Sequence, residues 1–384
     1  MATDTDAMVP VADLDDVAER GHAVVQVDGQ AIALFHHEGE VYAVDNRCPH
    51  MGFPLTRGTV EDGVLTCHWH HARFELEQGD TFDPWADDVQ TFPVDVREGG
   101  DGARVYLDPD PPRDVSESVH WRNRLADGLH ENISLVMAKA VIGLDAAGEG
   151  FHTPVETAVN FGTKYRDTGW GRGLTTLGCM ANLHADVGGR DKRRAMFVGV
   201  REVADECAGE PPRFQQYGFE NREVSKERLK RWFRDNCEVR DSNGAERVLL
   251  TAIANLPEED VAEILFAAAT DHLYMNASHT LDFVNTAFET LDHVGYEEHA
   301  DAVLASVVPQ LTGATRMEEQ SAWRNPVDIA DLVFDAHDRL GGLVAAGGGK
   351  TWERPEGFVE TLMGEDPETI LDALTGAIRE GATR

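Results

Sequence analysis

The amino-acid sequence predicts a multi-domain α+β protein, in which an N-terminal all-β antiparallel sandwich precedes a large all-α domain of helical hairpins. Short apolar runs separated by glycine turns occupy residues 8–109 of the 384-residue chain, a pattern typical of antiparallel sandwiches and barrels. Residues 117–384 carry helix-start signals and apolar side chains at helical spacing instead. The prolines between these two ranges favour a linker at residues 110–116.

The predicted strands of the first domain are short and end at turn-forming dipeptides such as Asp28-Gly29 and Asp62-Gly63. In chain order they are His22–Val27, Ala31–His36, Val41–Val44, Val64–Cys67, Ala72–Leu76, Phe92–Val96 and Ala103–Leu107.

Capping residues and prolines mark the helix starts of the second domain. Thr153 precedes Pro154 and stands three residues before Glu156, the pattern of a capping box with proline in the first turn. We read Glu156 as part of that cap. Further helices are predicted to start near Ser225, Pro257, Pro326 and Asp366.

The chain is strongly acidic, with 34 Lys and Arg residues against 69 Asp and Glu residues and a formal net charge of −35. Nucleic acid and anionic membrane surfaces need positive patches, so we expect neither as a partner. No run approaches the roughly 18 apolar residues of a membrane span. At molar salt the Debye length falls to ~3 Å and self-repulsion costs little. The acidic excess therefore favours a halophilic protein over an ordinary acidic one, as does the scarcity of lysine, which occurs only at Lys139, Lys164, Lys192, Lys226, Lys230 and Lys350.

Cysteine usage predicts a cytoplasmic protein without a disulfide framework. Five cysteines are scattered over the chain, and the N-terminus is acidic without an apolar leader. Cys179, Cys207 and Cys237 show no partner spacing, so we interpret them as small core residues.

Two Cys and two His residues form the strongest chemical pattern in the sequence. Cys48-Pro-His50 is followed, after sixteen residues, by Cys67-His-Trp-His70. Such ligands bind zinc or a Rieske [2Fe–2S] cluster, in which one iron takes two thiolates and the other takes two imidazoles. Zinc fingers usually place both cysteines before both histidines, so the interleaved order favours the cluster and leaves zinc as the alternative.

The segment from Cys48 to Leu76 closely resembles Rieske domains of the ferredoxin and ring-hydroxylating-oxygenase type, and the resemblance extends over about residues 10–108. It implies that the predicted sandwich is a Rieske [2Fe–2S] domain with one cluster per chain. Besides the Cys and His pattern, the residues that fit the loops of this family are Gly52, Pro54, Leu55, Gly58 and Trp69.

The resemblance implies four metal ligands, namely Cys48, His50, Cys67 and His70. The neighbouring His68 and His71 are competing ligands, although they fall outside the Cys-x-x-His spacing.

The resemblance also implies single-electron transfer, with a reductase or a ferredoxin as the electron donor. Respiratory-complex Rieske proteins carry an extra cysteine in each loop, which this sequence lacks. Since His71-Ala72-Arg73 offers no serine hydroxyl to the cluster sulfurs, we predict a reduction potential of roughly −150 to 0 mV. We expect the rings of His50 and His70 to form the electron port. Trp69 either packs over the cluster loops or belongs to the core.

The all-α domain lacks the patterns of two oxygen-activating iron sites. Asp127-Gly-Leu-His130 has no second histidine at the spacing of a mononuclear two-His, one-carboxylate iron site. A di-iron bundle needs two Glu-x-x-His motifs, and only one, from Glu117 to His120, is present. Whether this domain holds a second metal therefore stays open.

Four histidines of the all-α domain are candidate catalytic residues, because each is expected near a helix end. His272 and His279 would stand about 10 Å apart on one straight helix, unless a turn near Asn276 and Ser278 folds them together. Convergence of all four in one pocket competes with structural or surface roles for each of them. The four are His152, His184, His272 and His279.

The phrases FHTPVETAVNFG and DHLYMNASHTLDFVNTAFETLDHVG resemble the questin-oxidase-like helical family, whose members are similar to monooxygenases. Two functions follow as hypotheses. In the first, the Rieske domain feeds electrons to an oxidation of a small organic substrate in the helical domain. In the second, the chain is an electron carrier or redox-sensing module whose helical domain binds a protein partner.

Overall fold

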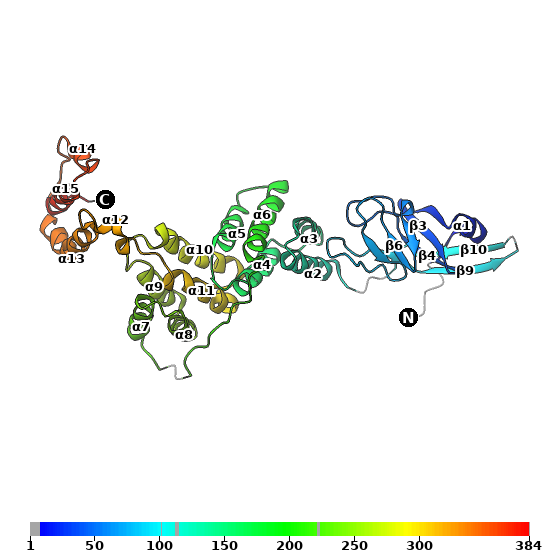
Figure 1. Ribbon diagram of the computed structural model, residues 1–384, viewed down its shortest axis with the longest axis horizontal. Coiled ribbons are helices and arrows are strands. Elements are labelled where there is room, and N and C mark those ends of the chain that lie inside the picture. Colours follow the sequence, from blue (N-terminus) through cyan, green and yellow to red (C-terminus); the bar gives the residue numbers. More distant parts are fainter. Residues whose placement is uncertain (1–7, 101, 112–114, 221–222, 384) are drawn as a thin grey trace. The chain divides into compact units, whose positions relative to one another are not determined.

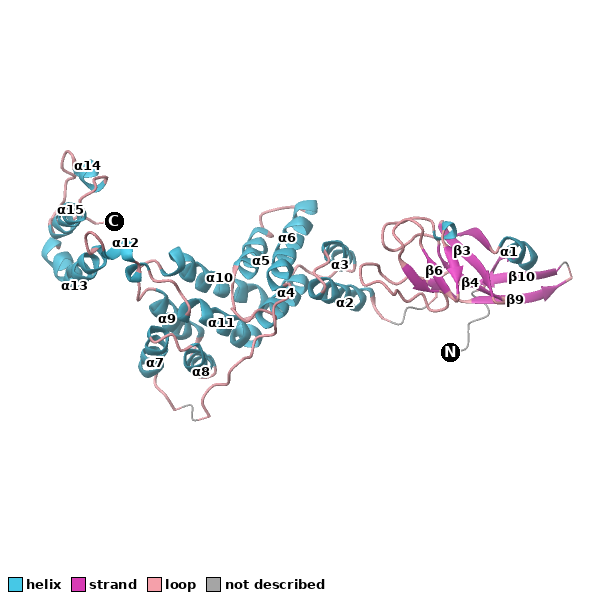
Figure 2. Ribbon diagram, in the orientation of Figure 1, coloured by secondary structure: helices cyan, strands magenta, loops and turns pink. Residues whose placement is uncertain are grey.

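The computed structural model describes residues 8–100, 102–111, 115–220 and 223–383 (Figures 1 and 2). N-terminal antiparallel sheets precede a large all-helical region, which confirms the predicted fold class. Part of the predicted linker, residues 112–114, lies outside the described residues. Among the residues that are described, no helix is both long and apolar enough to span a bilayer.

The N-terminal strands form antiparallel sheets with the orders β2-β3-β4-β8, β1-β10-β9 and β5-β6-β7. The third sheet belongs to an insertion that leaves the first sheet after β4 and returns to it at β8. The strands are β1 Val9–Asp13, β2 His22–Val27, β3 Gln30–His37, β4 Glu40–Asp45, β5 Thr59–Glu61, β6 Val64–Thr66, β7 Arg73–Glu75, β8 Thr91–Phe92, β9 Val94–Gly99 and β10 Gly102–Leu107.

Strand β3 contributes to two apolar cores because its side chains alternate between the two faces of its sheet. Ile32 and Leu34 pack with residues of β10 and with Val17. Ala33 and Phe35 pack on the other face with the insertion that carries the Cys and His motif. The central sheet is thus the platform on which the candidate metal centre rests.

A short helix, α1 (Leu14–Arg20), lies between the first two strands and was not predicted from the sequence. Its buried residue is Val17, and Gly21 ends it in the left-handed conformation with φ of 75°. One apolar contact on an acidic seven-residue segment is a weak periodic signal, so the tertiary contact rather than the local sequence defines this helix.

The helical region divides between two compact units, and each is described by itself. The first comprises Met1–Arg166 and Gly171–Pro212, within the described residues, and the second comprises Asp167–Trp170 and Arg213–Arg384. Helices α2 to α6 are Glu117–His130, Ser134–Ala146, His152–Lys164, Arg172–Leu183 and Gly189–Cys207. The second unit holds α7 Lys226–Glu238, α8 Ser242–Ile253, α9 Glu258–Ala269, α10 His279–Val294, α11 Tyr296–Thr312, α12 Ser321–Arg324, α13 Ile329–Gly347, α14 Phe358–Leu362 and α15 Pro367–Arg379.

Several predicted helix starts are confirmed, whereas the capping box at Thr153 is wrong. The Ser225 side chain caps α7, and the Asp328 side chain caps α13. Helix α4 instead begins at His152, after Phe151. The Thr153 hydroxyl donates to Glu149 Oε2 at 2.7 Å. It is therefore bound to an upstream carboxylate, whereas a capping box needs this hydroxyl to accept from a backbone amide.

Helices α2 and α3 form a hairpin with very close contacts. A Cβ added at Gly128 would lie 2.8 Å from Met137 Cγ, and one added at Gly143 would lie 2.2 Å from the Trp121 ring. Because these glycines leave no spare room, the side chains on the hairpin are held in a fixed relation to one another.

Candidate metal centre

The two loops that carry the motif have the same backbone pattern. In the first, the Cys48 amide donates to the Phe53 carbonyl at 2.8 Å, and the Gly52 amide donates to the Cys48 carbonyl at 2.7 Å. In the second, the Cys67 amide donates to the Ala72 carbonyl at 2.8 Å, and the amide four residues after Cys67 donates back to its carbonyl at 2.9 Å. Each cysteine therefore begins a closed turn that presents the next residues toward the other loop.

The histidines that compete as ligands have other positions in the second loop. His71 stands four residues after its cysteine, as Gly52 does in the first loop, and both adopt the left-handed conformation with φ of 63° and 83°. That position closes the turn. The exposed His68 contacts the Thr59 hydroxyl through Nε2 at 3.3 Å.

The four predicted ligands are paired, thiol beside thiol and ring beside ring. Cys48 and Cys67 are 3% and 1% exposed and lie in one apolar core, where their side chains contact each other. The ring centroids of His50 and His70 are 4.8 Å apart in an edge-to-face arrangement. No group of three His, Cys, Asp or Glu side chains within the described ranges surrounds a single metal position. Two-by-two pairing is the arrangement that a Rieske centre requires.

The electrostatics at these residues call for a bound cation. Burial, with a smaller contribution from the neighbouring Cys67, raises the pKa of the Cys48 thiol to about 11, so two thiolates cannot be stable there without positive charge. The Nδ1 atom of His50 is buried without a hydrogen-bond partner. Burial, then His70 and Lys139, lowers the pKa of His50, which keeps the ring in the neutral form that binds metals. These residues therefore fit a [2Fe–2S] cluster.

Two tryptophans flank the histidine pair in different ways. Trp85 contacts His50 edge-on, with ring centroids 4.7 Å apart, and belongs to the rim of the apolar core. Trp69 stacks on His70 at 4.5 Å and is half exposed. Of the two interpretations of Trp69, a core role is thus excluded, and this ring covers one face of His70. Phe74, in contrast, is completely buried.

Two cations of the α2–α3 hairpin contact the loops that flank His50. Lys139 Nζ donates a short hydrogen bond to the Pro49 carbonyl and lies 3.5 Å from Asp87 Oδ2. Arg124 Nε donates to Asp87 Oδ1 at 2.6 Å. The contacting residues are separated by between 37 and 90 residues in the sequence. No sequence motif or periodicity predicts contacts of this kind.

The candidate histidines of the first unit lie around one aromatic ring. Phe151 contacts His152 at 4.2 Å and stacks on His184 at 4.3 Å. Phe151 and His184 also line a small cavity of about 40 Å³ with Lys192. The structure thus brings these two histidines near each other, beside a cavity with room for little more than a water molecule.

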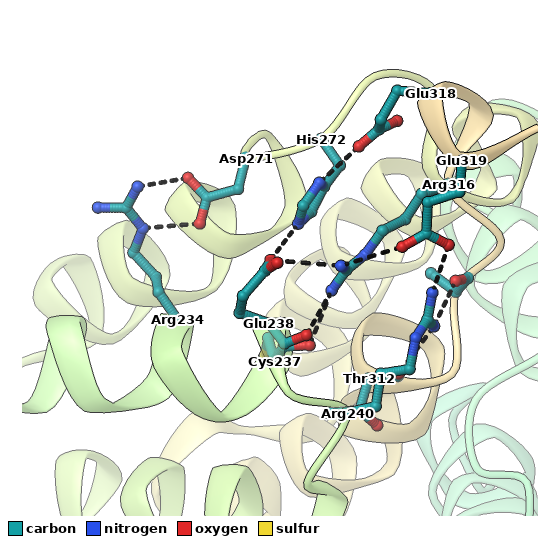
Figure 3. Close-up of polar contacts among 11 residues, drawn as sticks. Arg234, Cys237, Glu238, Arg240, Asp271, His272, Thr312, Arg316, Glu318 and Glu319 are labelled. Atoms are coloured by element: carbon teal, nitrogen blue, oxygen red, sulfur yellow. Dashed lines mark hydrogen bonds and ion pairs between the residues drawn. The ribbon is translucent and has the colours of Figure 1, made fainter. Parts of the chain in front are cut away.

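His272, in the second unit, is held between two carboxylates (Figure 3). Its Nδ1 lies 2.6 Å from Glu318 Oε1, and its Nε2 lies 2.8 Å from Glu238 Oε2. Both ring nitrogens of His272 are thus in contact with carboxylate oxygens. Arg316, only 4% exposed, joins the same network at 3.3 Å from Glu238. His272 is therefore part of a partly buried ionic network, in which the Glu238 side chain is 60% exposed.

A turn separates His272 from His279, as the cap-forming residues suggested. Tyr274, Asn276 and Ala277 have φ near 50° and Ser278 has φ of 78°, so the backbone leaves the helical conformation before α10 begins at His279. His279 stacks on Phe283 at 5.8 Å. Because His152 and His184 belong to one unit and His272 and His279 to the other, convergence of all four histidines stays a prediction.

The paired thiols and rings on an antiparallel sheet define the N-terminal domain as a Rieske [2Fe–2S] domain, and residues 7–93 match that family. The ferredoxin component of the naphthalene 1,2-dioxygenase/salicylate 5-hydroxylase systems of Ralstonia sp is 36% identical over 93 residues, which are 24% of this chain and 89% of that protein. The chain therefore belongs to the Rieske [2Fe–2S] family through this domain.

Two further comparisons cover the same region. The ferredoxin component of the alkene monooxygenase system of Xanthobacter autotrophicus is 35% identical over 104 residues, which are 27% of this chain and 82% of that protein. The match to a solved complex of reduced oxygenase and oxidized ferredoxin in carbazole 1,9a-dioxygenase covers 28% of this chain and 98% of that chain, at 23% identity and a TM-score of 0.26. These matches leave the resemblance of the helical region to the questin-oxidase-like family unconfirmed.

Proposed function

We propose that the chain is a Rieske redox protein that takes single electrons from a reductase or a ferredoxin and passes them to the oxidation of a small organic substrate in its helical region. The observation that carries this proposal is the pairing of two buried thiols and two histidine rings, with His70 at the surface. We propose Cys48, His50, Cys67 and His70 as the ligands. The use of free cysteines supports a cytoplasmic location.

The residues of the site have separate tasks in this function. When bound, the cluster supplies a reversible one-electron carrier. The apolar core around Cys48 and Cys67 keeps water from the sulfur atoms. Trp85 shields the ring of His50. Trp69 and Met51, which are 50% and 55% exposed, give the surface beside His70 an apolar character that suits docking of a redox partner.

The size and composition of the helical region support an oxidation there. A monooxygenation consumes one dioxygen, two electrons and two protons, and releases one water. The Rieske domain would therefore be reduced twice per turnover. His152 with His184, and His272 with its two glutamates, are the side chains that we propose for this chemistry.

Iron content and spectroscopy of the full chain test the proposal. We expect about two irons and two sulfides per chain after anaerobic reconstitution, and an electron paramagnetic resonance spectrum with the low average g-value of mixed nitrogen and sulfur ligation after reduction. C67S should lose both signals, whereas H68Q and H71Q should keep them. Iron that survives in C67S would reveal a metal in the helical region. A colourless wild-type protein would contradict the electron-transfer function.

An electron carrier or redox-sensing module is the alternative function. The two relatives compared above are ferredoxin components, and this observation favours a chain that only delivers electrons. Oxygen uptake by the reduced full-length protein separates the two functions. Uptake that a candidate substrate stimulates, with release of an oxidised product, supports the enzyme. Simple reoxidation with no product from any substrate supports the carrier.

A further inference from the structure

Lys139 of α3 contacts the backbone between two proposed cluster ligands. Its ammonium donates to the carbonyl of Pro49, which stands between Cys48 and His50 in the sequence. A hydrogen bond at this carbonyl restrains the peptide that sets the position of the His50 ring. The same ammonium lies 3.5 Å from Asp87, on the loop that places Trp85 against that ring.

Arg124 of α2 holds this second loop through three acceptors. Its Nε pairs with Asp87 at 2.6 Å, and its Nη2 donates to the Pro84 and Ala86 carbonyls, both at 3.0 Å. The Arg124 and Asp87 side chains are only 11% and 10% exposed. A buried pair of this kind is strongly destabilised when one partner is lost, so the α2–α3 hairpin is fixed on the cluster-binding insertion rather than resting loosely against it.

The charge of Lys139 matters for an electron that enters this site. Arg124 pairs with the carboxylates of Asp87 and Asp127, whereas the Lys139 ammonium, besides lying 3.5 Å from Asp87, donates to the backbone of the ligand loop. An added electron makes the site more negative, and a nearby positive charge stabilises that state. The side chain of Lys139 is 25% exposed, so solvent weakens this interaction less than it would at the surface.

We propose that Lys139 is a positioning residue for the Rieske centre and couples the α2–α3 hairpin to the redox state of that centre. This inference rests on the proposed electron-transfer function. A contact that favours the reduced site must itself be favoured by reduction, because coupling between two equilibria is reciprocal. Reduction therefore tightens the hold of the hairpin on the ligand loop. The helical region thus receives a structural signal together with the electron.

The close packing of the hairpin carries this signal beyond one side chain. Because Gly128 and Gly143 bring α2 and α3 into direct contact, a restraint on Lys139 restrains both helices. Hydrogen exchange of residues 117–146 reports that restraint along the whole hairpin.

The test compares three variants of the full-length, reconstituted protein by redox titration and by hydrogen exchange. K139M removes the charge and keeps an apolar stem, and K139R keeps the charge. K164M is the matched control, since Lys164 is an exposed lysine of α4 in the same unit. We expect a more negative reduction potential in K139M, a near wild-type potential in K139R, and no shift in K164M.

Hydrogen exchange gives a second result, and its main comparison, between the oxidised and the reduced wild type, needs no variant. In the wild type, dithionite reduction should slow exchange of residues 117–146 by about fivefold or more, and K139M should lose this difference. Equal potentials in wild type and K139M, an equal shift in K164M, or equal exchange in both redox states would each overturn the proposal. If K139M loses its iron, hydrogen exchange in the oxidised and the reduced wild type still tests the proposal. Absence of a Rieske spectrum in the wild type would instead refute the proposed function.

Discussion

Replacing Arg213 with methionine should unfold the second unit at a markedly lower temperature. Arg213 and Glu246 form a buried ion pair at 2.7 Å, with side chains that are 5% and 7% exposed. Arg213 also donates to the Ala305 carbonyl at 3.1 Å, and Glu246 accepts the Gln216 amide at 2.9 Å. The pair therefore ties helices α8 and α11 to the irregular segment that precedes α7.

R213M leaves the charge of Glu246 buried without its main partner, which costs about 3–5 kcal/mol. At about 2–4 °C per kcal/mol for a unit of this size, the unfolding temperature should fall by roughly 6–20 °C. Calorimetry, with hydrogen exchange of α8 to localise the change, measures this effect. The double variant R213M/E246M should recover most of the loss, because it removes both charges.

The matched control is R231M, which removes an exposed arginine of α7 and should change stability by no more than about 0.5 kcal/mol. The reasoning is refuted if R213M is as stable as R231M. It is also refuted if the double variant is no more stable than R213M, since the unpaired charge would then not be the cause.

Three further predictions concern the cluster loops, acid and salt. In G58A the new Cβ would lie 2.3 Å from a backbone carbonyl oxygen, so the loops must shift and we expect fewer irons per chain, whereas G100A meets nothing within 4 Å and should bind iron normally. Hydrogen bonds from Ser118 and Thr153 lower the pKa of Glu149 to about 2. The ionised Glu149 therefore stabilises the folded state fully above the unfolded pKa near 4.5, and this contribution is lost as the pH falls toward 2. It should be absent in E149Q, so the unfolding temperatures of E149Q and the wild type should converge in acid. Because the net charge is −35, the unfolding temperature should rise between 0.1 M and about 1 M KCl, and an unchanged value would contradict the halophilic interpretation.

The sequence was informative where the relevant contacts are local. Each ligand pair of the motif lies within four residues, and the turn that closes each loop is equally short, so the motif and the family resemblance that it carries were visible in the sequence. The strand segments were recognisable for the same reason: short apolar runs between turns, such as the run in β3, reflect a sheet covered on both faces.

Contacts between distant segments could not be predicted in this way. Lys139 is an ordinary helical lysine in the sequence, and Asp87 is one of many acidic residues; only the fold brings them together. The error at Thr153 has another origin, because the competing acceptor, Glu149, is only four residues away but precedes Thr153 and so lies outside the capping pattern. The network around His272 likewise depends on Glu318, which is 46 residues away in the chain.

The insertion between β4 and β8 has a consequence for protein engineering. Its two ends leave and re-enter the sheet side by side, since Val44 pairs with Thr91 and the Asp45 amide donates to the Gln90 carbonyl at 2.8 Å. A segment with adjoining ends can be exchanged as a cassette without stretching its host. Grafting residues 46–90 from a relative with a different reduction potential would then change the potential of this domain, while the surrounding strands are retained.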